Sequence, residues 1–412
     1  MPILAAFNLP SATPGLALLS LLALSAPVAQ VAMAAELSQQ DKELAINGPY
    51  YKKLVQMKDV VADILPPPAY IIEAQLGVLQ LIDLAEVATA DGTIDANEAK
   101  TIEQLIAYGV QLKDGAPGVF PGYYERIEVW KKELSEATPD EKLIKRLLTV
   151  KSVDPATKFF TARDASFVPL IRAGDVKGAK TVARNELKPL YLEHRAAVDA
   201  VVTRARRMTE KIEKEVADKL ASADAAVADL RIKSPLYLKV IQMKDLVADI
   251  LPPPAYIIES YLTVLQQIDE TEVALADGTI SAEEKELLTA LVEYGRQLES
   301  GDSSKGEMSG YKERIAVWVA DLGTETPEDI RIKELMTKLT CAPALKFYEV
   351  RNGSFLPTIA KGEVAAAKTI VRQELLPQYE AHRKQIDLLV TAANSMYERV
   401  QAKVDALLSG VK

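Results

Sequence analysis

Apolar residues recur at helical spacing through most of the chain. In the first such stretch Val55, Val60 and Ile64 lie on one stripe, which predicts a helix. The prolines at 66–68 end it, because proline cannot continue a helix and disfavours the helical conformation of the residue before it. No stretch of useful length alternates apolar and polar residues with the period of two that is typical of a strand. The pattern therefore predicts an all-α protein.

Capping signals divide the rest of the first half into further helices. One helix is expected from near Pro68 to Ile82, and Asp95 can cap the next, which we expect to end at Gly109. Thr138 is the expected cap of a later helix, with proline in its first turn. Further helices are predicted at 123–134, at 152–163 and from 177 onward.

Residues 190–230 contain neither proline nor glycine and predict one long helix. At 1.5 Å per residue it would span about 60 Å. We interpret it as a solvated linker helix that joins two halves of the protein and is broken near Pro235. The alternative is a helix that transmits a shift from one half to the other.

The chain after residue 35 consists of one module written twice. Residues 56–73 and 242–259 differ only in that Val60 is replaced by Leu246. Equivalent residues lie 186 positions apart at first and 188 apart after a loop that is two residues longer in the second copy. We expect two tandem helical-bundle domains, 35–231 and 232–412, that are joined by the long helix and fold independently.

The N-terminal segment resembles an export signal. Residues 1–35 carry no charged side chain, 15–26 are an apolar run, and Ala32 and Ala34 suit the −3 and −1 positions of a cleavage site. The run is short for a membrane span, and no second span is expected. We predict a signal peptide at 1–34 and a periplasmic or secreted protein. An uncleaved anchor is the alternative, because no Lys or Arg precedes the apolar run.

Composition excludes several classes of function. The chain has 49 Lys and Arg against 58 Asp and Glu, a net charge of −9, which argues against nucleic-acid binding. One cysteine excludes an intramolecular disulfide, and two histidines disfavour a metal enzyme. We expect no enzyme activity, no cofactor and no metal site.

Four motifs resemble the extracytoplasmic sensor region of bacterial methyl-accepting chemotaxis proteins. Each occurs in both modules, and in the second they are KDLVADILPPPAYIIE, YxERxxVW, FYxxRxxSFLP and YxxHRxxID, at 244–259, 311–318, 347–357 and 379–387. The resemblance implies a helical periplasmic domain that binds a small molecule in chemotactic signal transduction. The module is doubled here and no methylated cytoplasmic coiled coil is present, so we carry over ligand binding and expect a membrane receptor as the partner that signals.

The last motif brings together a candidate binding face. Tyr191, His194 and Arg195 share one helix face and are repeated as Tyr379, His382 and Arg383. Arginine can hold a carboxylate through two hydrogen bonds, so the set suits an anionic ligand. Alternatively, Arg195 pairs with Asp199 one turn later and His194 makes an ordinary polar contact.

The triple-proline motif contributes a second set of candidates. Tyr70 and Glu73, repeated as Tyr256 and Glu259, follow a backbone that the prolines hold rigid, as at a pocket edge. A rigid corner between helices explains the motif equally well. The remaining lining candidates are Trp130, Arg163, Trp318 and Arg351. Aromatic packing and surface ion pairs are the alternative for these four.

Two other features carry no site. Residues 91–98 resemble the second half of a calcium loop, but Val87 stands where the first ligand is needed, so we predict a turn before a capped helix. Cys341 faces Val153 of the other copy, which favours a small core residue over a nucleophile. We therefore expect an exported small-molecule-binding protein, with a ligand-free helical scaffold of the cell envelope as the alternative.

Overall fold

The computed structural model describes residues 39–64, 70–90, 92–118, 120–220, 231–250, 256–276, 278, 280–301 and 310–409. Every regular element in these ranges is a helix, and the only β-structure in them is two isolated bridges, Ala45–Arg231 and Ala116–Phe120. The all-α prediction is confirmed. The predicted signal peptide and the triple prolines of both copies lie outside the described residues.

The described residues of the first module form ten α-helices and three short π-helices. The α-helices are α1 (Gln39–Leu44), α2 (Pro49–Ile64), α3 (Ile72–Ala88), α4 (Ala96–Asp114), α5 (Tyr123–Glu133), α6 (Pro139–Arg146), α7 (Val153–Ala162), α8 (Val168–Arg172), α9 (Val176–Val182) and α10 (Lys188–Leu220). The π-helices η1 (Leu147–Lys151), η2 (Arg163–Phe167) and η3 (Ala183–Leu187) connect α6 to α7, α7 to α8 and α9 to α10.

The second module repeats this order from α2 onward. Its α-helices are α11 (Pro235–Ile250), α12 (Ile258–Ala274), α13 (Ala282–Ser300), α14 (Tyr311–Asp321), α15 (Pro327–Glu334), α16 (Cys341–Val350), α17 (Leu356–Ala360), α18 (Val364–Ile370) and α19 (Leu376–Ser409). Its π-helices are η6 (Leu335–Leu339), η7 (Arg351–Phe355) and η8 (Val371–Leu375). The repeat in the sequence is thus a repeat in the structure.

The predicted caps form as expected. The Asp95 side chain accepts hydrogen bonds from the backbone N–H groups of Asn97 and Glu98 at the start of α4. The Thr138 hydroxyl accepts from the N–H of Glu141, whose carboxylate accepts from the N–H of Thr138 in return. These reciprocal bonds satisfy backbone donors that have no partner inside the helix.

The predicted end of α4 at Gly109 was wrong. The helix continues to Asp114 and ends at Gly115, whose φ of 92° places it in the region that favours glycine. Gly109 has a packing role instead, because a Cβ atom there would collide with the guanidinium of Arg163. The glycine lets that side chain pass close to the backbone of α4.

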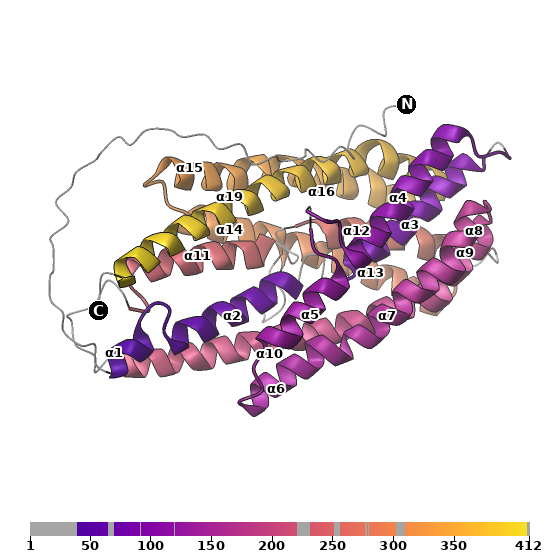
Figure 1. Ribbon diagram of the computed structural model, residues 1–412. Helices are drawn as coiled ribbons and strands as arrows, with labels where there is room; N and C mark the ends of the chain where they lie inside the picture. Colours follow the sequence, from indigo (N-terminus) through magenta and orange to yellow (C-terminus); the bar gives the residue numbers. More distant parts are fainter. Residues whose placement is uncertain are drawn as a thin grey trace.

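Helix α10 is not a solvated linker. It lies along α2 of its own module, just as α19 lies along α11 (Figure 1). Its buried stripe, Val201, Ala205, Met208, Ile212 and Val216, was hidden in the sequence among charged residues at the intervening positions. The long helix of each module, α10 or α19, therefore packs into the core of that module.

The two modules pack against each other around an approximate two-fold axis. Helix α2 contacts its counterpart α11, and α3 contacts α12. On the axis Ala45 bridges its own equivalent Arg231, and the ring of Tyr51 meets that of its equivalent Tyr237 edge-on with centroids 6.2 Å apart. Such a self-complementary interface is the arrangement of a two-fold dimer, here built within one chain.

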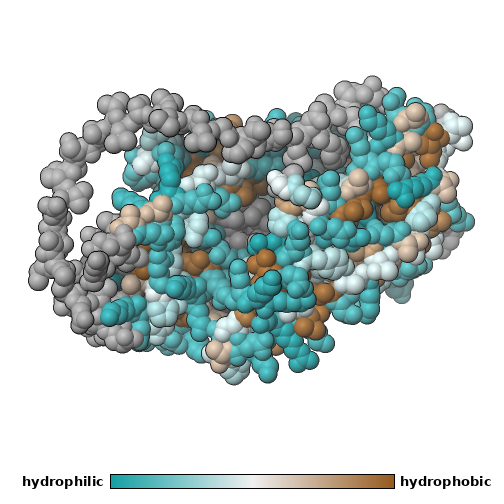
Figure 2. All heavy atoms as spheres, in the orientation of Figure 1, coloured by the Kyte–Doolittle hydropathy of each residue, from teal (hydrophilic) through white to brown (hydrophobic). Residues whose placement is uncertain are grey.

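Apolar side chains of both modules form a single buried core. The face drawn in Figure 2 is largely hydrophilic, with hydrophobic residues in small separate groups. Among the described helices, none combines the length and apolar character needed to cross a bilayer.

Candidate ligand-binding site at the module interface

A buried polar cluster joins the first module to the second. We call it cluster A; it consists of Tyr70, Tyr191 and Arg195 from the first module with Glu259 and Tyr294 from the second. The Nη2 atom of Arg195 donates to Glu259 Oε2 at 3.1 Å and to the Tyr294 hydroxyl at 2.5 Å. Tyr294 also donates to Glu259. The hydroxyls of Tyr70 and Tyr191 are 2.8 Å apart, and Tyr70 donates to Glu259 Oε1 at 3.3 Å.

The approximate symmetry produces a second cluster of the same composition. Cluster B consists of Tyr256, Tyr379 and Arg383 from the second module with Glu73 and Tyr108 from the first. Arg383 Nη2 donates to Glu73 Oε2 at 3.2 Å and to the Tyr108 hydroxyl at 2.6 Å. The hydroxyls of Tyr256 and Tyr379 are 2.9 Å apart. Eight of the predicted site residues thus meet in two clusters, but each cluster combines tyrosines and arginine of one module with glutamate of the other.

The electrostatics of cluster A favour a charged pair that is sheltered from water. The side chain of Glu259 is 5 % exposed and that of Arg195 is 27 % exposed. Burial alone would lower the pKa of Arg195, but the negative charge of Glu259 together with the neighbouring tyrosines outweighs burial and raises that pKa. Burial, together with Glu259, raises the pKa of Tyr294. Both tyrosine and arginine therefore keep their protons and act as donors to the carboxylate.

Asp199 is a weak second partner of Arg195. Its Oδ2 lies 3.9 Å from Arg195 Nε, and its side chain is 64 % exposed, so this contact contributes little beside the pair with Glu259. The guanidinium that we expected to hold an anionic ligand is already neutralised by a carboxylate. An anionic ligand at this position would have to compete with Glu259.

The two predicted histidines adjoin the clusters from the core side. Both are fully buried, and His194 Nδ1 lies 2.8 Å from the carbonyl oxygen of Ser152, with the same distance from His382 Nδ1 to that of Thr340. The ring of His194 also stacks on Tyr70, with centroids 6.0 Å apart. This placement supports the ordinary polar contact that we considered as the alternative.

The predicted arginines Arg163 and Arg351 lie outside the clusters. Arg163 is buried and donates to the carbonyl of Ile106 at 2.9 Å and to Asp164 at 2.6 Å. Arg351 donates to the carbonyl of Gly295 at 2.6 Å. Burial lowers the pKa of both arginines. Their hydrogen bonds lie within their own modules and tie η2 to α4 and η7 to α13.

The two tryptophans differ in their surroundings. Trp130 is buried in the first module with the Arg126 guanidinium 6.0 Å from its ring. Trp318 is also largely buried but lines a cavity between the modules. Trp318 is therefore placed beside space that a ligand can occupy.

The cavity beside Trp318, which we call the interface cavity, has a volume of about 380 Å³. Helices α2, α10, α11 and α14 surround it. Its lining residues are Met57, Lys58, Val61, Arg206, Thr209, Glu210, Glu213, Asp245, Arg314, Val317, Trp318 and Asp321. An ion pair of 2.5 Å between Lys58 and Asp245 links the two modules at its wall.

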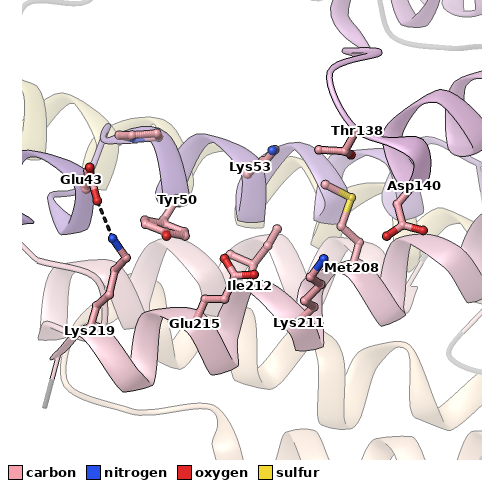
Figure 3. A pocket seen from close by; sticks show the side chains of 11 residues that line it. Glu43, Tyr50, Lys53, Thr138, Asp140, Met208, Lys211, Ile212, Glu215 and Lys219 are labelled. Carbon is pink, nitrogen blue, oxygen red and sulfur yellow. Dashed lines mark hydrogen bonds and ion pairs between the residues drawn. The ribbon is translucent and has the colours of Figure 1, made fainter.

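A larger cavity of about 530 Å³ lies within the first module (Figure 3). It is bounded by α1, α2, α6 and α10, and charged side chains of both signs point into it. Lys219 pairs with Glu43 at 2.6 Å across one end, and Lys53 pairs with Glu141 at 2.8 Å. No residue that the sequence analysis singled out for binding lines this cavity.

Four charged residues form a ring on the approximate axis. Lys180 and Lys368 each pair with both Glu86 and Glu272, so two equivalent residues from each module meet. This ring was not predicted from the sequence. Tyr108 and Tyr294 of the clusters were not predicted either, although their repetition before a glycine at the same offset is visible in the sequence.

The structure adds no metal site among the residues that it describes. Asp91 and Asp277 of the calcium-like loops lie outside the described residues, and Asp95 serves as a helix cap. Within the described ranges no three His, Cys, Asp or Glu side chains are grouped as a metal ion needs. Cys341 is buried with Sγ 3.3 Å from the carbonyl of Met336, which agrees with a small core residue.

Comparison with known protein families, with curated proteins and with solved structures found no match. The resemblance to chemoreceptor sensor regions therefore stays a prediction from the sequence motifs.

Proposed function

We propose that this chain is an exported small-molecule-binding protein whose ligand lies between the two modules and which acts through a membrane partner. The observation that carries the proposal is the interface cavity of about 380 Å³. Its volume falls within the range of known small-molecule sites, roughly 300–1,000 Å³. Its walls come from both modules, so a bound ligand would contact both at once.

The clusters supply a reason why ligand binding would matter to the whole molecule. A ligand that changes how α2 and α14 are spaced changes the packing of one module on the other. Arg195 with Glu259, and Arg383 with Glu73, cross the same interface. Since hydrogen bonds of this length tolerate little displacement, a shift between modules would strain both clusters together. Ligand binding would thereby change the hydrogen bonds of both clusters.

The sensor-like motifs support the same proposal. The motif residues Glu73 and Arg383 and their equivalents lie at the module interface, and Trp318 lies beside its cavity. For an exported sensor of this kind, the partner that signals would be a membrane receptor.

A ligand-free scaffold is the second candidate, because charges across the interface compensate each other without a ligand. Lys58 pairs with Asp245 at 2.5 Å, and its equivalent Lys244 pairs with Asp59 at 2.7 Å. The ring of Lys180, Lys368, Glu86 and Glu272 is likewise neutral as a whole.

The test is a thermal-shift screen of the exported protein against organic acids, amino acids and amines. Each compound that stabilises the protein is then titrated against Val61→Phe, which fills the interface cavity, and Glu215→Phe, which fills the cavity of the first module. We expect the first variant to lose binding and the second to retain it. No stabilising compound would favour the ligand-free scaffold, whereas retained binding in Val61→Phe would place the ligand outside the interface cavity and overturn the proposed site.

A further inference from the structure

The two sides of the module interface differ at one decisive position. Tyr397 on α19 is the equivalent of Thr209 on α10. On its side of the interface the Nζ atom of Lys244 lies 3.9 Å from the centre of the Tyr397 ring. The same lysine pairs with Asp59 at 2.7 Å. The chain thus places one of its own aromatic rings on a lysine that bridges the modules.

The other side lacks this ring. Lys58 is the equivalent of Lys244 and bridges to Asp245 at 2.5 Å, but Thr209 stands where a tyrosine would cover it. Both Lys58 and Thr209 line the interface cavity. The lysine side chain is 13 % exposed, so its ammonium group is held in place and partly desolvated.

We infer that the interface cavity binds one small aromatic ring per chain, placed on Lys58 as the Tyr397 ring is placed on Lys244. This inference rests on the proposed function and names the class of ligand. A cation over an aromatic face is attracted by the ring, and more so where water is excluded. Met57, Val61 and Trp318 supply apolar walls for the ring edges.

The polar lining indicates that the ring carries polar substituents. Arg206 and Glu213 line the cavity, whereas their equivalents are the neutral amides Asn394 and Gln401. Glu210 adds a further carboxylate. The side of the interface that lacks the aromatic ring thus carries charged residues of both signs. Such a lining suits a ligand with both an acidic and a basic group.

The first measurement uses p-cresol, which is the tyrosine side chain as a free molecule, and saturation-transfer NMR with the full chain. We expect binding with a Kd of about 1 mM or tighter, the range open to a fragment of this size. Cyclohexylmethanol is of similar size but has no aromatic face. It should bind at least about ten times more weakly if the contact between the ammonium group and the aromatic ring contributes about 1.4 kcal/mol. Equal binding of the two compounds, or no p-cresol signal, would overturn the inference.

The second measurement exchanges the residues at positions 209 and 397, which distinguish the two sides of the interface. Thr209→Tyr supplies the missing ring and should weaken p-cresol binding at least about tenfold. Thr203→Tyr, at an exposed position on the same helix, is the matched control and should leave binding unchanged. Tyr397→Thr should open a second site and raise the stoichiometry from one to two.

Unchanged binding in Thr209→Tyr would overturn the inference even if Tyr397→Thr failed to fold. Failure of p-cresol to bind, while a non-aromatic compound from the screen loses binding in Val61→Phe, would remove the aromatic class and leave the proposed function standing.

Discussion

The guanidinium of Arg195 and the carboxylate of Glu259 form an ion pair of 3.1 Å across the boundary between the two modules. The equivalent residues Arg383 and Glu73 repeat it at 3.2 Å in the opposite direction. The paired residues lie 64 positions apart in the first pair and 310 apart in the second. They meet because the two modules pack face to face. Each arginine thus pairs with the glutamate of the other copy of the module within the same chain.

Removing one member of this pair should destabilise the whole protein. Glu259→Gln leaves Arg195 without its counter-charge and should lower the free energy of unfolding by about 1–3 kcal/mol, since the arginine is partly solvated and the penalty is below that of a fully buried charge. Urea unfolding measures it. Combining the change with Arg195→Gln should cost less than the sum of the two single changes by about 1 kcal/mol.

An exposed pair serves as the matched control for this cycle. Arg399 and Glu328 are 2.6 Å apart with side chains that are 56 % and 46 % exposed. Glu328→Gln should leave the free energy of unfolding nearly unchanged, because exposed ion pairs are screened by solvent. Strict additivity in the Arg195–Glu259 cycle would mean that the crossed pair does not stabilise the interface.

The isolated first module should not fold as an independent monomeric domain, contrary to what the sequence repeat predicts. Residues 35–231 alone would expose the faces of α2 and α3 that the second module covers, and Glu73 would keep its bond from Tyr108 but lose Arg383. Because the interface is self-complementary, two copies of this fragment can reproduce it, with Arg195 of each facing Glu73 of the other. We expect a concentration-dependent dimer in sedimentation experiments. A stable monomer with a cooperative melt would support independent folding instead.

Gly109 should not tolerate a side chain. A Cβ there meets the guanidinium of Arg163, which is 2 % exposed and hydrogen-bonded to α4, so it cannot move away easily. Gly109→Ala should destabilise the protein by about 1–3 kcal/mol in thermal or urea unfolding. Gly77→Ala in α3, with nothing within 4 Å of the added atom, should instead stabilise it by about 0.5–1 kcal/mol. The same sign for both substitutions would contradict this account.

Acid should weaken the contact between the modules through Glu86. Burial by itself raises the pKa of this carboxyl, but hydrogen bonds from Lys180 and Lys368 outweigh it and lower the pKa from 4.5. A carboxyl whose pKa is depressed by folding contributes stability above its unfolded pKa, and that contribution is lost as the pH falls through the folded value.

The measurement compares the wild type with Glu86→Gln. Urea unfolding at about pH 7 and about pH 3 should show a larger acid-induced loss of stability in the wild type than in the variant. The difference should shrink at high salt, since the ring is partly exposed. Equal losses in both proteins would show that Glu86 does not contribute to the acid sensitivity.

The exported form should begin near Ala35. The uncharged apolar run at 15–26 and the small residues Ala32 and Ala34 favour cleavage after Ala34. Intact-mass analysis of the exported protein checks this. A mass that includes residues 1–34 would instead identify the segment as an anchor.

Much of the local structure could be predicted from the sequence because its causes are local. The helical period, the caps at Asp95 and Thr138, and the duplication all depend on residues a few positions apart or on direct comparison of the two copies. The candidates Tyr70, Glu73, Tyr191 and their equivalents were predicted as two separate sets, and the structure brings members of both sets together in each cluster. Tyr108 and Tyr294 were missed, since their role depends on which helix faces them.

The amino-acid sequence by itself determined that this protein is helical, that its elements occur twice, and which tyrosine, arginine and glutamate side chains recur with them. Only the tertiary structure decided that Arg195 meets Glu259 rather than Asp199, that α10 lies in a core, and that Thr209 leaves space where Tyr397 fills it. The physical reason is that these outcomes follow from packing between segments far apart in the chain. A repeat encodes two similar surfaces, but it does not state whether they face solvent or each other.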